Sequence, residues 1–275
     1  MQRKAGLPFY IFLIVFVFLV MFPFLWMLAS SIKPATELFG EDAFNPFTSH
    51  PTIENYVSVF TNSPFLRYLW NSFVVSSITT IYTVTVASFA AYAVARLQFK
   101  GKTVILGIVL SVTMFPQIAV ISPIYIFLKN IGLTNSYLGL IIPYTTITLP
   151  LSIWLLVTFF RKIPNDLEEA AKMDGATLMQ TYWRVIFPLA LPGIFTTAIL
   201  VFIAAWNEFL FALTINTDDK YKTVPIGISM FQGQYTIQWG EIAAATVIVT
   251  IPLVVLVLLF QRRIVSGLTS GSVKE

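Results

Sequence analysis

The sequence predicts an all-α membrane protein with six transmembrane helices, and two observations lead to this fold class. First, 57% of the 275 residues are hydrophobic and only 11% are charged, with a mean hydropathy of +0.80, whereas soluble domains are roughly 45–50% apolar. Second, six apolar stretches reach the length of about 18 residues that a membrane-crossing helix needs. They cover residues 8–32, 70–95, 104–128, 138–160, 191–213 and 242–260.

The first stretch follows Arg3 and Lys4, so it begins as a secretory signal peptide does. Its apolar run extends to Trp26 and Leu28, which is longer than the typical ~7–15-residue core of a signal peptide. We therefore expect a retained span.

The orientation of the spans follows from the basic residues between them. With the N-terminus inside, twelve of the 17 Lys and Arg residues fall on the inner side and five on the outer side. Because basic loops favour the cytoplasm, both termini and the polar insert 163–193 are predicted to be cytoplasmic. The net charge of +4 is then explained by topology, and no nucleic-acid partner is expected.

The outer loops differ in character. Residues 33–69 contain four prolines and are expected to form an extended segment on the bilayer surface. The last outer loop, 216–241, contains glycines and aromatic residues that suit either a contact surface or an interfacial belt. We expect it to face outward and to contact a soluble partner through Gln232, Gln234 and Tyr235.

Spans two to four carry many Ser and Thr residues, and Pro116, Pro143 and Pro150 lie inside spans three and four. Small hydroxylated residues favour close helix packing, while intramembrane prolines free carbonyl groups that neighbours or a water-lined cavity must satisfy. The pattern favours a bundle that bends around a pathway, with Gln117 and Tyr144 as candidate lining residues.

Asn207 and Glu208 are the most polar pair inside any predicted span. An ionisable residue within a span costs roughly 2.5–3.5 kcal/mol even on the mildest scales, so it usually faces the bundle interior or a cavity. Both are therefore candidates for a gate or a substrate path. Three roles are open for Glu208: a hydrogen-bonding role at a gate or subunit interface, lining of a substrate path, or snorkelling to the membrane surface.

The residue types exclude several chemistries. The chain has no cysteine and a single histidine, His50, in the first outer loop. It contains neither a phosphate-binding GxxxxGK[ST] loop nor an HExxH zinc motif. We therefore expect no cofactor, no metal site and no catalytic residues, and an intramembrane enzyme has no credible machinery here.

The insert between spans four and five reads as two short helices. Pro164 and Asn165 mark a helix start, and Asp166 with Glu169 has the spacing of a capping box. Gly175 is a natural stop because it tolerates a left-handed conformation. A second helix, capped by Thr177 and Gln180, is expected to run to Pro188.

The first of these helices is acidic. An amphipathic hairpin on the lipid headgroups is one interpretation, but an anionic inner leaflet would repel such a helix. The composition therefore favours a protein partner. The acidic residues stand against a single Lys172 and are Asp166, Glu168, Glu169 and Asp174.

The stretch EAAKMDGATLMQTYWRVIFP resembles the EAA loop of permease subunits of binding-protein-dependent ABC importers. The positions that match its pattern are Glu169, Ala170, Ala171, Gly175, Val185 and Pro188, while Phe187 replaces the usual Leu. The stretches AAWNEFLFAL and QWGEIAAATVIVTIP and the tail GLTSGSVKE are similar to the smaller, maltose-permease-like subunit of carbohydrate importers. The resemblance covers nearly the whole chain.

This resemblance implies a type I ABC importer permease fold. It divides the chain into a first helix with its outer loop (1–66), a permease core (67–263) with the coupling loop at 163–190, and a cytoplasmic tail (264–275). The loop, including Asp174, would couple to a cytoplasmic ATPase dimer that alone hydrolyses ATP. Further implied partners are a second, homologous permease in a heterodimer and an extracytoplasmic sugar-binding protein, all at a bacterial or archaeal cytoplasmic membrane.

The sequence does not identify the sugar, or which of the two permeases holds it. A permease for a non-sugar solute is the nearest alternative. A stand-alone secondary transporter is a weaker one, because such proteins often show internal repeats and would have no use for an acidic coupling loop.

Overall fold

A computed structural model describes residues 6–39, 41–233 and 236–269 of the chain. Within this part every named element is a helix, and the remaining pairing is an isolated bridge between Gln232 and Ile237. The chain divides into two compact units. Of the described residues, those within 6–66 and 227–252 belong to unit 1, and those within 67–226 and 253–269 belong to unit 2.

The structure confirms the all-α class. Within the described ranges, five helices are long and apolar enough to cross a membrane, and a bent pair of helices raises the number to as many as six. The five are α1 (Leu7–Ser31), α4 (Phe65–Arg96), α7 (Tyr137–Lys162), the continuous helix Leu178–Trp206, and the Trp239–Gln261 part of α13 (Trp239–Thr269).

Unit 1 contains α1, the first part of α13 and three short helices, which are α2 (Ala35–Leu38), η1 (Glu41–Phe44) and α3 (Glu54–Thr61). Asn55 of α3 donates from Nδ2 to the carbonyl oxygens of Ser31 (2.9 Å) and Lys33 (2.8 Å). The first of these bonds satisfies a carbonyl that the end of α1 leaves free, and the second satisfies a carbonyl two residues beyond the helix. The expectation of an extended 33–69 loop is therefore wrong, because the segment contains short helices and Asn55 of α3 bonds it to the end of α1.

The start of α13 packs on α3 within unit 1. A Cβ on Gly240 would lie 2.3 Å from Asn55 Oδ1, so only a glycine allows this approach. Ser58 Oγ of α3 also donates to Glu241 Oε1 at 3.2 Å.

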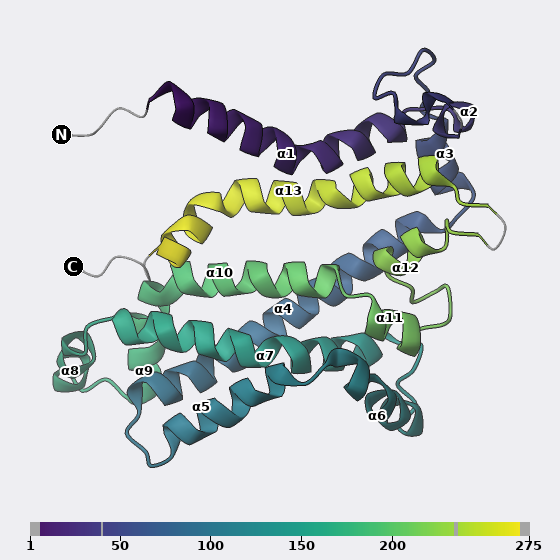
Figure 1. Cartoon of the computed structure of the whole chain (residues 1–275). Helices are drawn as coiled ribbons and strands as arrows, with labels where there is room; N and C mark the ends of the chain where they lie inside the picture. The colour runs from purple at the N-terminus through teal and green to yellow at the C-terminus, as the bar shows by residue number, and fades with distance from the viewer. Residues whose placement is uncertain (1–5, 40, 234–235, 270–275) are drawn as a thin grey trace. The chain divides into compact units, whose positions relative to one another are not determined.

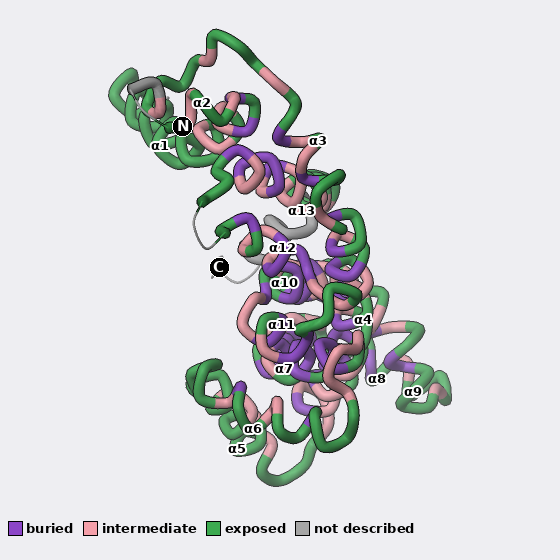
Figure 2. The backbone as a smooth tube through the Cα atoms, turned by 90° about the vertical axis from the view of Figure 1, so that its right-hand side faces the viewer, coloured by how far each residue is buried: buried purple, intermediate pink, exposed green. Residues whose placement is uncertain are grey.

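Unit 2 is built around α4, α7 and α10 (Phe187–Trp206). In Figure 1, α4 and α7 run in one direction and α10 in the other, while α5 (Lys102–Ser111) and α6 (Gln117–Asn130) lie beside α7. Figure 2 shows the buried residues of unit 2 concentrated on α4, α7 and α10. Two apolar clusters fill this bundle, one toward each end.

The crossing of α7 and α10 depends on a glycine. A Cβ on Gly193 would lie 2.3 Å from Cγ of Phe159, so the Phe159 ring sits directly against the α10 backbone. Close approach at a small residue is the usual way in which membrane helices pack.

The third span is broken, contrary to the prediction of a continuous helix over 104–128. Residues Lys102–Met114, which include η2 (Val112–Met114), and Gln117–Asn130 meet at 96°. Phe115 (ψ 130°) and Pro116 (ψ 130°) are both extended at the break. A proline disfavours the helical region for the residue before it and lacks an N–H of its own, so the helix stops here.

The fifth span also differs from the prediction of residues 191–213. It starts earlier, because α9 (Leu178–Thr181), the π-helix η3 (Tyr182–Ile186) and α10 form one continuous helix that passes through Pro188 without ending. It stops at Trp206, and a separate short helix, α11 (Leu210–Ile215), follows. The second helix of the insert is thus the entry of span five.

Candidate functional site

The insert forms a short exposed helix, α8 (Asp166–Met173), that ends at a glycine as predicted. Gly175 has φ 78°. Its N–H donates to the Lys172 oxygen (3.0 Å), and the N–H of Ala176 donates to the Ala171 oxygen (2.9 Å). This pair of bonds is the Schellman motif, which closes a helix end with a left-handed residue.

The predicted capping box after the glycine is confirmed. Gln180 N–H donates to Thr177 Oγ1 at 3.4 Å, and Thr177 N–H donates to Gln180 Oε1 at 2.8 Å. Both polypeptide turns of the loop are therefore closed by bonds within the loop itself.

The predicted capping box at the start of α8 is wrong. Asp166 is already the first helical residue, and Asn165 at the N-cap makes no side-chain cap bond. The Asn165 Oδ1 instead accepts a hydrogen bond from Nη1 of Arg96, the last residue of α4. The Asn165 oxygen that would cap α8 is therefore bound to a residue of α4 instead.

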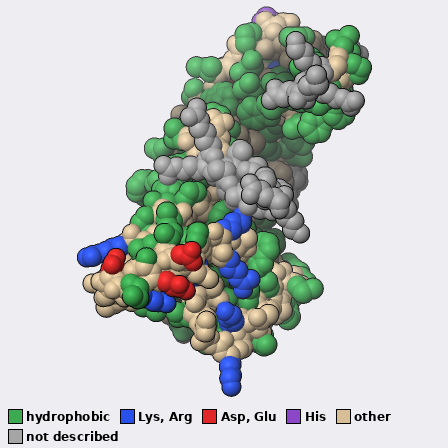
Figure 3. Space-filling model, turned by 90° about the vertical axis from the view of Figure 1, so that its left-hand side faces the viewer, with side chains coloured by type: hydrophobic (Ala, Val, Ile, Leu, Met, Phe, Trp, Pro, Cys, Tyr) green, Lys and Arg blue, Asp and Glu red, His purple; other side chains and the backbone are tan. Residues whose placement is uncertain are grey.

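The acidic face is smaller than predicted, because Glu168 is buried (8% exposed). Its Oε1 lies 3.2 Å from Arg96 Nε. The acidic residues that remain exposed are Asp166, Glu169 and Asp174. At the end of unit 2 that carries α8, Figure 3 shows acidic side chains with basic side chains around them.

The other predicted coupling residues occupy the same loop or its continuation. Ala170 is exposed beside Glu169, Ala171 is half-buried, and Met173 is 89% exposed. Pro188 is exposed two residues inside α10. The structure thus brings the α8 residues together as a protruding knob and places Pro188 further along the chain, in span five.

The entry of span five is anchored by an aromatic residue that sequence reasoning missed. Tyr182 begins the π-helix and is buried, and its hydroxyl lies 2.6 Å from Ser88 Oγ of α4. Its ring packs against those of Phe89, Tyr92 and Trp183. Single π-helical turns inside α-helices are frequent at functional positions.

Glu208 lies at the break after span five rather than inside it. It is 6% exposed, and its two carboxylate oxygens accept from Phe211 N (3.0 Å) and Ala212 N (3.2 Å) at the start of α11. The fully buried Tyr144 hydroxyl lies close to this carboxylate, without a hydrogen bond of good geometry. The neighbouring Asn207 is exposed and donates to the Ile203 oxygen at 2.8 Å.

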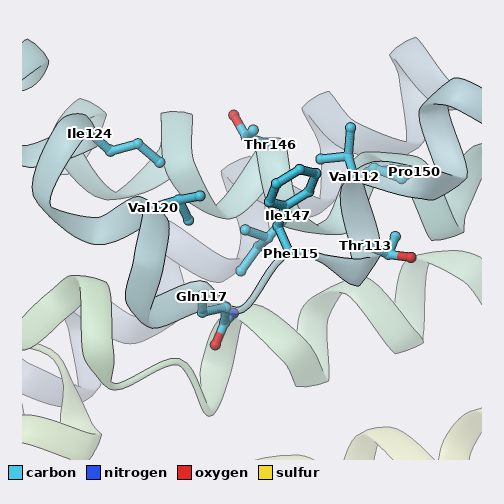
Figure 4. A pocket seen from close by; sticks show the side chains of 9 residues that line it. All are labelled: Val112, Thr113, Phe115, Gln117, Val120, Ile124, Thr146, Ile147 and Pro150. Atoms are coloured by element: carbon cyan, nitrogen blue, oxygen red, sulfur yellow. The ribbon is translucent and has the colours of Figure 1, made fainter.

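The break in span three forms a cavity of about 550 Å³. Figure 4 shows the nine side chains that line it, which are Val112, Thr113, Phe115, Gln117, Val120, Ile124, Thr146, Ile147 and Pro150. Gln117 also lines a second cavity, of about 210 Å³, with Thr148, Ser152 and Thr197 of α7 and α10. Gln117 is therefore the predicted path residue that the fold places at a cavity, whereas Tyr144 and Glu208 are packed inside the bundle.

Three asparagines that sequence reasoning missed fasten the opposite end of unit 2. Asn71 Nδ2 donates to the oxygens of Lys220 (3.0 Å) and Lys222 (2.8 Å). Asn135 Oδ1 accepts from the backbone of residues 217 and 218, and Asn216 exchanges bonds with the backbone of Ser136.

Of the three residues predicted to contact a soluble partner, Gln232 is exposed in unit 1 and forms the isolated bridge with Ile237. Gln234 and Tyr235 lie outside the described residues.

These features define a multi-pass membrane component with a protruding polar loop at α8 whose turns are closed by its own hydrogen bonds. Residues 83–270 match the family described as the binding-protein-dependent transport system inner membrane component, and the chain belongs to this family. It is a transport component rather than an enzyme.

Relatives align over nearly their whole length. The chain is 46% identical over 254 residues to the trehalose/maltose transport system permease protein MalG of Thermococcus litoralis, covering 91% of this chain and 90% of the relative. It is 47% identical over 252 residues to the trehalose transport system permease protein SugB of Mycobacterium tuberculosis, covering 91% of each. The sulfoquinovosyl glycerol transport system permease protein SmoH of Agrobacterium fabrum is 40% identical, over 91% of this chain and 87% of the relative.

A solved structure confirms the fold. A chain of a bacterial ABC transporter involved in the import of the acidic polysaccharide alginate superposes with a TM-score of 0.75 at 20% identity, covering 95% of this chain and 99% of that one.

Proposed function

We propose that this chain is the permease subunit of an ATP-driven carbohydrate importer, and that trehalose and maltose are the first substrates to test. The observation that carries the coupling role is α8, a helix that protrudes from the bundle with Glu169, Ala170 and Met173 exposed. The substrate class is supported by the two relatives at 46% and 47% identity, whose names specify trehalose or maltose transport.

The coupling partner is a cytoplasmic ATPase that takes α8 into a groove. A helix that exposes Asp166, Glu169 and Asp174 near a membrane surface would be repelled by anionic lipid, so a basic protein groove suits it better. The loop keeps its shape when a partner pulls on it because its turns are closed by internal hydrogen bonds.

The pathway is completed by a second, homologous permease in a heterodimer. Gln117 supplies a hydrogen-bonding group at the break of span three, and Asn207 supplies one at the end of span five. Glu208 and Tyr144 support the break that exposes Asn207 and do not line the path directly. An extracytoplasmic binding protein delivers the sugar to the face that carries Gln232, opposite the coupling loop in the predicted topology.

The test is a reconstituted complex of this chain with its partner permease, ATPase and binding protein. We expect trehalose or maltose to stimulate ATP hydrolysis and to be taken up with it. The variant Glu169→Lys should lose the ATPase in mild detergent. The control variant is Glu54→Lys, because Glu54 is an exposed acidic residue of α3 in unit 1, and it should keep the ATPase bound. Stimulation by a non-sugar solute alone would overturn the carbohydrate assignment. Full ATPase retention by Glu169→Lys would overturn the coupling role.

A further inference from the structure

Arg96, the last residue of α4, binds four groups at the base of the insert. Its Nη2 donates to the carbonyl oxygens of Phe160 and Ile163, both at 2.5 Å, and its Nη1 donates to Asn165 Oδ1. Its Nε lies 3.2 Å from Glu168 Oε1. The Arg96 side chain is 4% exposed and that of Glu168 is 10% exposed.

An arginine suits this arrangement better than a lysine does. The Phe160 carbonyl accepts one bond from Ile163 N (3.2 Å) and can accept a second, while the Ile163 carbonyl lies just beyond the end of α7. A planar guanidinium has donors on several sides at fixed angles, which a lysine ammonium lacks. Removal of one partner of a buried ion pair leaves an uncompensated charge. Glu168 and Arg96 therefore hold each other in place, although neither can touch a partner from inside the bundle.

Arg96 belongs to a stripe on α4 that meets both sides of the insert. Ser88, Tyr92 and Arg96 are four residues apart, so they share one helix face. The Tyr92 ring packs against Phe160 at the end of α7 (6.3 Å between centroids) and against Tyr182 at the entry of span five (5.1 Å). Ser88 bonds the Tyr182 hydroxyl.

We propose that this stripe makes α4 the helix that receives the movement of the coupling loop, with Arg96 as its positioning residue. The chain sequence joins α8 only to α7 and to span five, but the stripe fastens both ends of the insert and α8 itself to α4. When α8 is displaced, α4 then moves with it, because the insert and the stripe move as one rigid body. Without Arg96, α8 moves relative to α4 and its displacement is not transmitted. This inference rests on the proposed coupling function of α8.

The test uses the complete reconstituted complex with Arg96→Gln, Arg96→Lys, Glu168→Gln and Tyr182→Phe variants. Arg161→Gln is the matched control. Arg161 lies at the end of α7 that Arg96 contacts, but its side chain is exposed. For each variant we would measure the ATPase retained per permease, the basal hydrolysis, and the ratio of binding-protein-stimulated to basal hydrolysis.

We expect Arg96→Gln to retain the ATPase, because the docking residues Glu169 and Asp174 are untouched, but to lower the stimulation ratio about tenfold. Arg96→Lys should restore part of the ratio, and Tyr182→Phe should lower it by a smaller factor. Arg161→Gln should match the parent. The double variant Arg96→Gln/Glu168→Gln should be no worse than Arg96→Gln, since the pair acts as one unit.

A purely structural role for Arg96 would reduce the amount of assembled complex and leave the ratio per complex unchanged, which would overturn the inference. If Arg96→Gln does not assemble, Glu168→Gln and Tyr182→Phe decide, and a normal ratio in both would overturn it. If Glu169→Lys loses the ATPase while Arg96→Gln keeps the full ratio, the role of Arg96 is refuted and the proposed coupling function of α8 stands. Retention of the ATPase by Glu169→Lys would instead remove the proposed function on which it rests.

Discussion

At the scale of single residues, Gly175 sets the shape of the proposed coupling loop through its backbone alone. No heavy atom lies within 4 Å of the position that a Cβ would occupy. Any cost of a substitution there comes from the left-handed conformation at φ 78° and not from crowding.

We therefore expect Gly175→Val to cost about 1–2 kcal/mol in loop stability and to reduce ATPase retention, because the chain relieves the strain by leaving the turn at another angle. Gly175→Asn should keep most of the retention, since asparagine tolerates this region. The measurement is ATPase co-purification in mild detergent. Equal retention in both variants would mean that the angle at residue 175 does not matter for docking.

A second residue-scale prediction concerns Glu208, which caps α11 from a buried position. Glu208→Leu removes both bonds to the backbone amides and should cost about 1–2 kcal/mol, the upper range for a helix cap. Glu208→Gln keeps one carbonyl oxygen and should fall between Leu and the parent.

Thermal denaturation of the purified complex would measure this, with Glu54→Gln as an exposed acidic control. Unchanged stability together with normal uptake in Glu208→Leu would leave the carboxylate without a role in the fold or on the path.

At the scale of elements, α7 and α10 pack as closely as they do because Gly193 admits the Phe159 ring. Gly193→Ala adds a single methyl group in direct overlap with the ring, which forces the two helices apart or the ring out of its rotamer. Such overpacking costs about 1–3 kcal/mol.

The matched control is Gly107→Ala in α5, where nothing lies within 4 Å of the added Cβ. We expect Gly193→Ala to lower the thermal midpoint of the complex and Gly107→Ala to leave it or raise it slightly. Adding Phe159→Ala to Gly193→Ala should recover part of the loss, because the overlap disappears. A strictly additive double variant would show that the two residues do not press on each other in the membrane.

At the scale of the whole molecule, the predicted topology places the loop end of unit 2 in the cytoplasm and Gln232 outside. The chain has no cysteine of its own, so labelling of a single introduced cysteine is not obscured by labelling of other residues in the chain. Gln232→Cys should react with an impermeant maleimide on intact cells, and Lys172→Cys only after permeabilisation. Both positions are exposed. The reverse pattern would invert the topology.

Local chemistry made part of this structure predictable. The Gly175 stop and the Thr177–Gln180 cap each depend on residues a few positions apart, and both are found as the sequence predicts. The apolar stretches likewise predicted the spans, because membrane insertion depends on composition over about 20 residues.

Features that depend on distant partners were not predictable. Arg96 and Glu168 are far apart in the sequence, so nothing marked Glu168 as buried rather than part of the acidic face. The prolines posed the same problem, since Pro116 ends its helix while Pro143 continues inside α7. A proline pattern shows where a helix can break, and the surrounding helices decide where it does.

The turns of the proposed coupling loop have a consequence for how such transporters change over evolutionary time. From Ala171 to Gln180 the turns are closed by bonds among their own residues, and no heavy atom lies within 4 Å of the position that a Cβ on Gly175 would occupy. A loop of this kind can be exchanged between homologous permeases without matching changes in the neighbouring helices. On the proposed coupling role, one ATPase then serves several permeases with different substrates, provided that each permease keeps the arginine at position 96 that binds the base of the loop.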